Sequence, residues 1–426
     1  MCAHRIAGFG KPTIWTKLSE ISAKLNAMDL GQGFPNWNPP KFLVENLQKA
    51  EKEGMSFQYS RAYGDLDLEN VISEFYSPLL KKKLYPSNNI CVTEGASSAL
   101  FSSIIGLVNP GDEVVVLEPA YDCYMAQVQM AGGKYIGVPL IPPKPLTKEE
   151  LKGRFSANGH FEFKRENDSF KIDFEKLKEN LTNKTKLLIM NSPHNPTGKI
   201  FTFDEFSKLS SLLKEFPQIK IVSDEVYEFN LYEDIKELPR IASVEGLYER
   251  TISVYSAGKT FSATGIRIGM AVGPEDLISS VKAVHQYSSF CIFKPLQQAV
   301  AESYRSHIIN PLSTYKKDLV DQYRSNRNLL LKSFSDSSLN FKFYIPEAGY
   351  FLILDIEDLE YPDSYKEENE TNDIGCSTFL ANEKKVVFIP LSVFYSEQTK
   401  KFGKNYIRAA FCKTPETIKM AAENIK

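Results

Sequence analysis

The chain has 426 residues, of which 42% are hydrophobic, 24% charged and 12% aromatic, a composition typical of a globular protein long enough for two domains. Its net charge of −2 and pI of about 6.3 argue against partners such as nucleic acid or an anionic membrane. No apolar run approaches 18 residues, and the first residues lack the apolar core of a signal peptide. We therefore expect a cytoplasmic protein, with a mitochondrial form left open.

Cysteine and histidine spacing argues against metal or disulfide chemistry. The six cysteines are scattered and form no C-x-x-C pair, which favours reduced thiols. Only five histidines occur, none in H-x-x-x-H spacing, so no metal site is predicted.

From about residue 88 onward, short apolar runs alternate with helical patterns. The spacing predicts strands over residues 90–95, 113–119, 186–193, 219–226 and 251–256, and helices over residues 96–108 and 204–216. Such alternation is typical of an α/β fold with a mostly parallel sheet covered on both faces. Ligands of such sheets bind beyond the carboxyl ends of the strands, where Gly95, Tyr121, Asn195, Asp224 and Lys259 fall.

The rest of the chain predicts a smaller unit and two insertions. A long helical pattern follows Tyr304, and residues 341–356 contain a strand pair hinged at a glycine, which indicates a smaller α+β domain. Residues 142–169 and 357–373 are polar and poor in periodic apolar positions, so we expect surface loops there.

The segment VYSAGKTFSATGIRIG, residues 254–269, places Lys259 among small polar residues, and Arg267 follows eight positions later. A phosphate-binding Walker loop is excluded because Ser253 stands where its first glycine is required. A serine acyl-enzyme matches Ser256 and Lys259 as S-x-x-K, but its companion motifs are incomplete and in the wrong order. A lysine that forms a Schiff base with a pyridine cofactor is the remaining interpretation.

That interpretation requires partners for each part of the cofactor. Asp224 can keep the ring nitrogen protonated, and Asn195 and Tyr227 can donate to the ring oxygen. Side chains and N–H groups suited to the phosphate and the ring face come from Gly95, Ala96, Ser256, Arg267 and Tyr121. Each has an ordinary structural explanation when taken singly. Because these residues follow the ends of successive predicted strands, one shared site is favoured.

The motifs NSPHNPTGK (residues 191–199), SDEVY (residues 223–227) and SAGKTFSATGIRIG (residues 256–269), in this order, resemble those of the class I aminotransferases of fold type I. Nearly the whole chain shares this resemblance. Three further segments narrow it to the group of kynurenine aminotransferases, glutamine transaminase K and cysteine-S-conjugate β-lyases: DLGQGFPNWNPP, GDEVVVLEPAYDCY and IPLSVFYS.

The resemblance implies an architecture and a cofactor. A large domain, residues 46–315, would surround a mostly parallel seven-stranded sheet, and residues 316–426 would form the smaller α+β domain. Residues 1–45 would supply an N-terminal arm and part of the small domain. The chain would form a homodimer with shared active sites and carry pyridoxal 5′-phosphate on Lys259.

The same resemblance assigns roles to individual residues. Lys259, Asp224 and Tyr227 would be catalytic, and Asn195 would join the last two in holding the ring. The phosphate would be held by Gly95, Ala96, Ser97, Ser256 and Arg267, with Tyr59 reaching the phosphate of the neighbouring subunit. The substrate would contact Gly33, Asn195, Arg408, Trp15 and Phe290, with Arg408 on its carboxylate.

The chain departs from this group at three places. Gly95, Ala96 and Ser97 stand where relatives often carry Gly-Gly-Tyr, and Cys291 replaces a histidine of the mammalian-type enzymes. Arg267 replaces the lysine of some relatives and keeps its charge. These changes leave the chemistry intact but affect which amino acid is preferred.

The expected activity is transfer of the amino group of L-kynurenine, or of a related aromatic, glutamine or sulfur amino acid, to a 2-oxo acid with ping-pong kinetics. Elimination from cysteine S-conjugates is an expected side activity. The alternatives are a C–S β-lyase or a general aromatic aminotransferase as the principal activity. An inactive cofactor-binding protein is disfavoured, because it would not need both Lys259 and Arg408.

Overall fold

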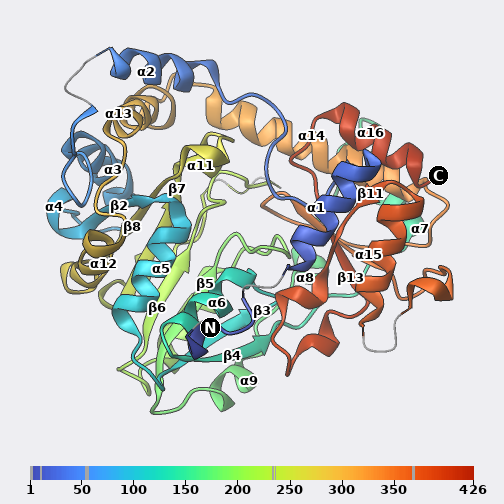
Figure 1. The fold of residues 1–426 in the computed structure, drawn as a ribbon, viewed down its shortest axis with the longest axis horizontal. Coiled ribbons are helices and arrows are strands. Elements are labelled where there is room, and N and C mark those ends of the chain that lie inside the picture. Colours follow the sequence, from blue (N-terminus) through green and yellow to red (C-terminus); the bar gives the residue numbers. More distant parts are fainter. Residues whose placement is uncertain (1–2, 10–11, 53–56, 233–234, 236, 367–369) are drawn as a thin grey trace.

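The computed structural model describes residues 3–9, 12–52, 57–232, 235, 237–366 and 370–426. Its largest sheet has seven strands in the order β2-β8-β7-β6-β5-β3-β4 (Figure 1). In chain order these are β2 (Ile90–Glu94), β3 (Glu113–Glu118), β4 (Lys134–Pro139), β5 (Thr185–Asn191), β6 (Lys220–Asp224), β7 (Thr251–Ser256) and β8 (Ile268–Val272). The five strands predicted from the sequence all belong to this sheet, which confirms the expected α/β architecture.

The strands are short apolar runs whose side chains are nearly all buried, as expected where helices cover both faces of a sheet. Six strands run in the same direction, and only β8, which pairs antiparallel with both β2 and β7, runs the opposite way in this sheet of the described residues. The register pairs Glu94 with Ile268 and Ser256 with Gly269. The start of β8 therefore lies at the same edge of the sheet as the ends of β2 and β7.

Helices pack around this sheet in the part of the molecule that holds β2 to β8 (Figure 1). They are α2 (Lys41–Glu51), α3 (Leu66–Leu79), α4 (Pro86–Asn89), α5 (Gly95–Leu107), α6 (Asp122–Met130), α9 (Phe174–Glu179), α10 (Phe203–Leu212), α11 (Ala257–Thr260), α12 (Glu275–Ser288) and α13 (Lys294–Ser303). The sequence marks some of their starts clearly: Thr202 and Glu205 form a reciprocal capping box that begins α10.

A second sheet of four antiparallel strands has the order β12-β13-β10-β9. It lies in the remaining part of the molecule, where Figure 1 labels β13. Its strands are β9 (Lys342–Tyr344), β10 (Phe351–Asp355), β12 (Ile389–Pro390) and β13 (Tyr406–Ala410). Helices α14 (Tyr315–Ser335), α15 (Asn372–Glu383) and α16 (Pro415–Asn424) accompany it. This is the smaller α+β unit that the sequence predicts.

The N-terminal segment joins this second unit. Strand β1 (Met28–Asp29) pairs in parallel with β11 (Val386–Val387), and α1 (Ile14–Leu25) contacts α15. This pairing is consistent with an N-terminal arm that contributes to the small domain. The domain boundaries at residues 45 and 315 stay a prediction.

The long helix expected directly after Tyr304 is interrupted. A π-helical turn covers Tyr304–Ile309, and α14 begins only at Tyr315, beyond the Asn310-Pro311 pair. No helix of the described residues is long and apolar enough to cross a membrane.

The insertion at residues 142–169 lies mostly at the surface, as its composition predicts, but it is not a loop throughout. It contains α7 (Lys148–Gly153) and α8 (Arg165–Asp168), and Leu151 and Phe161 are fully buried against the second unit. Its polar residues pair within the fold, as Arg154 does with Asp168. The segment at residues 357–373 is ordered around Tyr361, which stacks on Phe379, while its residues 367–369 lie outside the described residues.

Candidate active site

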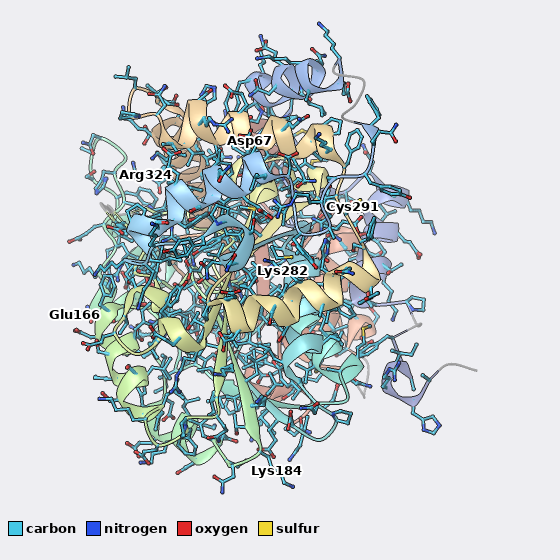
Figure 2. All side chains as sticks on the ribbon, turned by 90° about the vertical axis from the view of Figure 1, so that its left-hand side faces the viewer. Asp67, Glu166, Lys184, Lys282, Cys291 and Arg324 are labelled. Carbon is cyan, nitrogen blue, oxygen red and sulfur yellow. The ribbon has the colours of Figure 1, made fainter. Side chains whose placement is uncertain are left out.

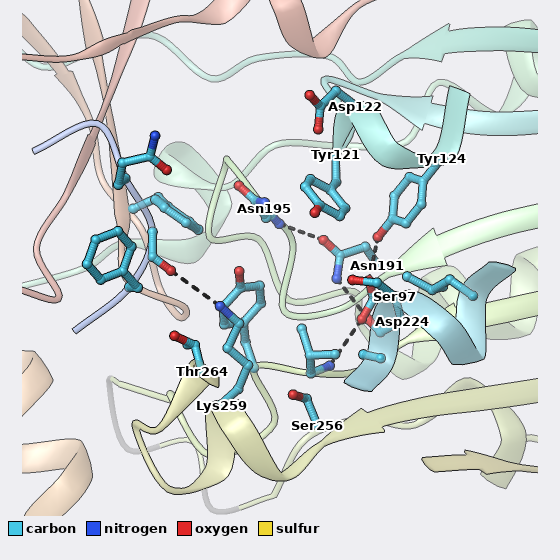
Figure 3. Close-up of a pocket in the computed structure, with 18 of the residues that line it drawn as sticks. Ser97, Tyr121, Asp122, Tyr124, Asn191, Asn195, Asp224, Ser256, Lys259 and Thr264 are labelled. Carbon is cyan, nitrogen blue, oxygen red and sulfur yellow. Dashed lines mark hydrogen bonds between the residues drawn. The ribbon is translucent and has the colours of Figure 1, made fainter. Parts of the chain in front are cut away.

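A cavity of about 400 Å³ opens beyond the carboxyl ends of the parallel strands (Figure 3). The residues that line it are Trp15, Gln32, Gly33, Phe34, Ala96, Ser97, Leu100, Tyr121, Asp122, Tyr124, Asn191, Asn195, Asp224, Val226, Tyr227, Ser256, Lys259, Thr264, Arg267, Phe351 and Arg408. The structure thus gathers most of the predicted site residues in one place.

The sheet topology explains this convergence. Strands β5, β6 and β7 run parallel and end at Asn191, Asp224 and Ser256, so these residues meet at one edge. Arg267 reaches the same edge from the opposite direction, because it directly precedes the antiparallel strand β8.

Lys259 lies on the short helix α11 and points into the cavity (Figure 3). Its Nζ donates to Tyr350 Oη at 2.5 Å and to the carbonyl of Gly33 at 3.3 Å. Burial lowers the pKa of this amine to about 8, while Cys412 and Asp224 partly offset the effect. Near neutral pH the amine can therefore both give and take a proton.

Asp224 is held at the end of β6 by three neighbours. Tyr124 Oη donates to its Oδ2 at 2.6 Å, the Val226 N–H donates to its Oδ1 at 3.3 Å, and Asn191 donates to its main-chain carbonyl (Figure 3). Burial raises the pKa of Asp224 to about 6, although the bonds from Tyr124 and Val226 act against this rise. A cationic ring nitrogen beside Asp224 would stabilise the ionised carboxylate and so offset the cost of burying it.

This raised pKa predicts a pH-dependent stability for the cofactor-free protein. Between the unfolded pKa of 3.8 and the folded pKa of about 6, the folded chain binds more protons than the unfolded chain. Its free energy of unfolding therefore falls as pH rises through this window. Asp224→Asn removes this pH dependence. The free energy of unfolding of the variant minus that of wild type should therefore be on the order of 2 kcal/mol larger at pH 7 than at pH 4.

Urea unfolding of both cofactor-free proteins at pH 4 and pH 7 measures the effect. Other buried carboxyls with raised pKa values, such as Glu69 and Glu118, are present in both chains, so their contributions cancel in the difference. Equal pH dependence in the two proteins would contradict the burial of an ionised Asp224.

Gly95 and Arg267 form a cradle at the N-terminus of α5. Gly95 has φ +74°, and a Cβ built there would stand 2.5 Å from Arg267 Nη2, so the guanidinium lies directly over this glycine. Gly269 is placed as tightly, because a Cβ built on it would stand 2.3 Å from the Ala96 nitrogen. A guanidinium and the free N–H groups of a helix start together suit a phosphate.

Gly95→Ala should therefore weaken binding of pyridoxal phosphate about tenfold or more. The new methyl group displaces Arg267, and the left-handed backbone adds strain of about 1–3 kcal/mol. Fluorescence titration of the cofactor-free protein with pyridoxal phosphate measures the affinity.

Gly111→Ala is the matched control for this change. Gly111 also has a positive φ, +92°, but a Cβ built there would meet nothing within 4 Å. The substitution should cost stability through backbone strain alone and leave cofactor affinity unchanged. Equal losses of affinity in the two variants would contradict the cradle.

Arg408, on β13, brings a buried guanidinium to the opposite wall of the cavity. Its Nη1 donates to Asn195 Oδ1 at 3.0 Å and its Nη2 to the Gly31 carbonyl at 2.8 Å, while Nε has no partner in the described part of the chain. Burial lowers the pKa of Arg408 to about 10. Among the described residues no carboxylate forms an ion pair with it. The cation is thus poised for an anionic ligand.

Aromatic rings surround this guanidinium. Its central carbon lies 3.9 Å from the ring centre of Phe351, 4.9 Å from that of Phe394 and 5.1 Å from that of Trp15. Trp15 is fixed in turn by its Nε1, which donates to Asp122 Oδ2 at 2.9 Å. These contacts give the cavity an apolar wall beside the buried guanidinium.

Gly33 lies where two segments approach closely. A Cβ built on it would stand 2.6 Å from the Phe351 ring, so only glycine fits without moving that ring. Its carbonyl faces Lys259. The structure therefore places the predicted Gly33, Trp15 and Arg408 around one cavity, while their roles in substrate binding stay predictions.

Tyr59 and Phe290 are not in the cavity of their own chain. They contact each other edge to face, 5.4 Å between ring centres, on the surface, where Tyr59 is 85% exposed and Phe290 46% exposed. Cys291, the next residue, marks this side of the molecule (Figure 2). For Tyr59 such a position suits the role across a subunit interface that the sequence resemblance implies. The predicted substrate contact of Phe290 is not found in the cavity of its own chain, and both roles stay predictions.

Several residues in or beside the cavity are absent from the set that the sequence predicts. Tyr124 bonds the Asp224 carboxylate, Asn191 bonds Asn195, and Tyr350 bonds Lys259. Asn191 begins the NSPHNPTGK motif, which is a signal that could have identified it. Tyr124 ends the GDEVVVLEPAYDCY segment, which is a comparable signal, whereas Tyr350 carries no local signal that separates it from core aromatics.

The residues present fit pyridoxal phosphate. An amine with a lowered pKa, a buried carboxylate and a guanidinium over a glycine meet in one cavity, each suited to a different part of that cofactor.

Comparison with known proteins agrees with this fit. The family model for class I and II aminotransferases matches residues 26–425. The kynurenine–oxoglutarate transaminase of Dictyostelium discoideum is 36% identical, over 99% of this chain and 95% of the relative. Human kynurenine–oxoglutarate transaminase 1 is 34% identical, over 97% of this chain and 94% of the relative.

Solved structures share the whole fold. Bna3p of Saccharomyces cerevisiae superposes with a TM-score of 0.86 at 32% identity, over 100% of this chain and 98% of its own. YbdL of Escherichia coli, for which a methionine aminotransferase function was identified, superposes with a TM-score of 0.83 at 28% identity, over 100% and 99%. The chain therefore belongs to the class I and II aminotransferase family and is a pyridoxal phosphate-dependent transaminase.

Proposed function

We propose that this transaminase takes the amino group from L-kynurenine, or from a related aromatic, glutamine or sulfur amino acid, and passes it to a 2-oxo acid. The observation that carries the proposal is the buried guanidinium of Arg408 on an apolar wall of the cavity. A fork of this kind binds an α-carboxylate in a bidentate manner, and the rings of Trp15 and Phe351 suit a large side chain. Two relatives named for kynurenine point to the same donor.

In this proposal each wall of the cavity holds one part of the cofactor. Asn195, Asp224 and Tyr227 would hold the ring, and Tyr121 would lie against it. Gly95, Ala96, Ser97, Ser256 and Arg267 would hold the phosphate. When bound, pyridoxal phosphate supplies an electron-withdrawing ring that stabilises negative charge on the substrate Cα.

Lys259 would move the proton in this reaction. Its Nζ would take the proton from the substrate Cα and would later return it two atoms further along, on the far side of the nitrogen that is being transferred. Its pKa of about 8 suits both roles near neutral pH. The Asp224 carboxylate, buried on β6, supplies the negative charge that balances a cationic ring nitrogen.

The two substrates would share this one site in turn. The carboxylate of the first product and that of the 2-oxo acid would both need Arg408. The first product must therefore leave before the 2-oxo acid binds, so we expect ping-pong kinetics. Amino acids with a leaving group at Cβ would partly eliminate it, giving pyruvate and ammonia. A C–S β-lyase or a general aromatic aminotransferase is the alternative principal activity.

A homodimer is part of the proposal. Four exposed aromatic residues lie together on one face in edge-to-face pairs: Phe57, Tyr59, Phe290 and Phe293. An exposed apolar cluster of this kind favours contact with a second copy of the chain. Tyr59 would then reach the phosphate held by that copy. The cytoplasm stays the predicted compartment.

The visible absorption spectrum of the purified protein tests this function. We expect a yellow protein whose lysine-bound cofactor band disappears when L-kynurenine is added without an oxo acid. A 2-oxo acid should restore the band. A colourless protein that takes up no pyridoxal phosphate would contradict the role of Lys259.

Other donors separate the proposal from its alternatives. A yellow protein that ignores kynurenine but responds to phenylalanine is a general aromatic aminotransferase. A protein that releases pyruvate from S-conjugates much faster than it transaminates kynurenine is principally a lyase. A spectrum that no amino acid changes would mean a cofactor-binding protein without catalysis.

A further inference from the structure

Tyr350 contacts the amine of Lys259 although no sequence motif marks it. It lies just before β10, is only 1% exposed, and its Oη is 2.5 Å from Lys259 Nζ. The same oxygen is 2.7 Å from the carbonyl of Gly33. One hydroxyl thus links the N-terminal segment, the second sheet and the lysine on α11.

The direction of these bonds follows from the chemistry of the groups. A phenol has a single proton, and the Gly33 carbonyl can only accept, so the Tyr350 O–H donates to Gly33. Its oxygen is then left to accept a hydrogen bond from Lys259 Nζ. The Gly33 carbonyl accepts a second, longer bond from the same Nζ at 3.3 Å (Figure 3).

Aromatic packing fixes the Tyr350 ring in this position. Tyr323, on α14, stacks on it with ring centres 5.7 Å apart and planes 18° apart. Tyr227 meets its edge at 5.0 Å and 86°. Tyr323 itself bonds Ser262 Oγ at 2.9 Å and has no hydrogen bond to Lys259 among the described residues. The hydroxyl of Tyr350 therefore has little freedom to leave the amine.

We propose that Tyr350 is a positioning residue that holds the amine of Lys259, whenever it is free of the cofactor, against the Gly33 side of the cavity. By accepting from Nζ it favours the protonated amine and keeps it at one place between proton transfers. The proposal rests on the role of Lys259 in the proposed function. It assigns Tyr350 no contact with the substrate.

Other groups also act on the charge of Lys259. Cys412 and Asp224 favour its protonated form, and Arg408 and Arg267 disfavour it. Replacing the Tyr350 hydroxyl leaves these four side chains in place, although Arg408 and Tyr227 also interact with that hydroxyl. A shift of the amine pKa in such a variant therefore reports on the Tyr350 contact.

Tyr350→Phe removes the hydroxyl and keeps the ring, and Tyr323→Phe is the matched control on the neighbouring stacked ring. The first readout is the pH dependence of the rate at which the cofactor-free protein captures pyridoxal phosphate, trapped with borohydride. Only the neutral amine reacts, so the half-point of the profile reports the Lys259 pKa. In Tyr350→Phe it should move down by about one pH unit, the size of one lost hydrogen bond to a charged group.

The second readout is turnover of the holoenzyme with the donor that bleaches its spectrum. In Tyr350→Phe, kcat should fall about tenfold while the KM for the amino acid stays unchanged, because the amine is misplaced but the carboxylate site is intact. Tyr323→Phe should match wild type in the half-point, kcat and KM.

An unshifted half-point in a folded Tyr350→Phe, or an equal shift in Tyr323→Phe, would overturn the proposal. A Lys259→Ala variant separates this outcome from failure of the proposed function: if that variant turns over normally, Lys259 has no role for Tyr350 to support.

Should Tyr350→Phe fold poorly, 3-fluorotyrosine at position 350 keeps the hydroxyl and weakens its oxygen as an acceptor. It should move the half-point in the same direction by a smaller amount, and no movement would overturn the proposal.

Discussion

Lys259→Ala abolishes transamination, and Lys259→Arg does so as well. Both changes remove the only amine that lies in the cavity among the described residues. A guanidinium stays charged at all accessible pH values, so arginine cannot take the proton from the substrate Cα. We expect turnover to fall by about 10³-fold or more, the upper range for loss of a general acid–base group.

Steady-state turnover and the bleaching of the visible band measure this loss. Lys199→Met is the control, because Lys199 is also a buried lysine but pairs with Glu205 at 2.9 Å and does not line the cavity. It should cost stability and leave the turnover of the folded enzyme near that of wild type. Normal turnover in either Lys259 variant would refute the assignment of the catalytic lysine.

The edge of the large sheet is predictable from the sequence because its signals are local. Short apolar strands end in Asn191, Asp224 and Ser256, and parallel strands must bring such ends together. Lys259 follows the end of β7 within about one helical turn, so the same logic places it beside them. Arg267 joins them because β8 reverses direction, which the family resemblance supplies and spacing alone does not.

The contacts that tune these groups are not predictable, because they join residues far apart in the chain. Tyr124 reaches Asp224 across 100 positions, and Tyr350 reaches Lys259 across 91. A tyrosine in an apolar run has the same local pattern whether it fills a core or bonds a catalytic group. Only the packing of α6 and β10 decides between the two.

The surface loop predicted at residues 142–169 is confirmed only in part, for a related reason. Helices α7 and α8 have 6 and 4 residues, too short to show a helical period, so their polar residues resemble a loop. Phe161 is nevertheless fully buried, and Arg154 pairs with Asp168 rather than with water. Tertiary packing overrides local composition there.

Arg408→Met should lower kcat/KM for every amino acid by about 10²–10⁴-fold, since a substrate carboxylate then enters a buried site without its cation. The same change should alter the stability of the cofactor-free protein little, because removal of the buried charge offsets the loss of its bonds to Asn195 and Gly31. Arg408 is a buried charge with no ion pair among the described residues and with a pKa lowered by burial, so methionine removes a desolvation cost. Methionine also fills the space between the rings of Trp15 and Phe351.

Arg327→Met separates this functional role from a structural one. Arg327 is equally buried, but it donates to the Pro346 carbonyl and packs on the rings of Phe161 and Tyr232 outside the cavity. Its loss should lower the melting temperature and leave the KM of the folded enzyme unchanged. Arg408→Lys, which keeps the charge but not the fork, should fall between wild type and Arg408→Met in kcat/KM. If Arg408→Met instead unfolds the protein and Arg408→Lys binds amino acids normally, the guanidinium is structural and another group holds the carboxylate.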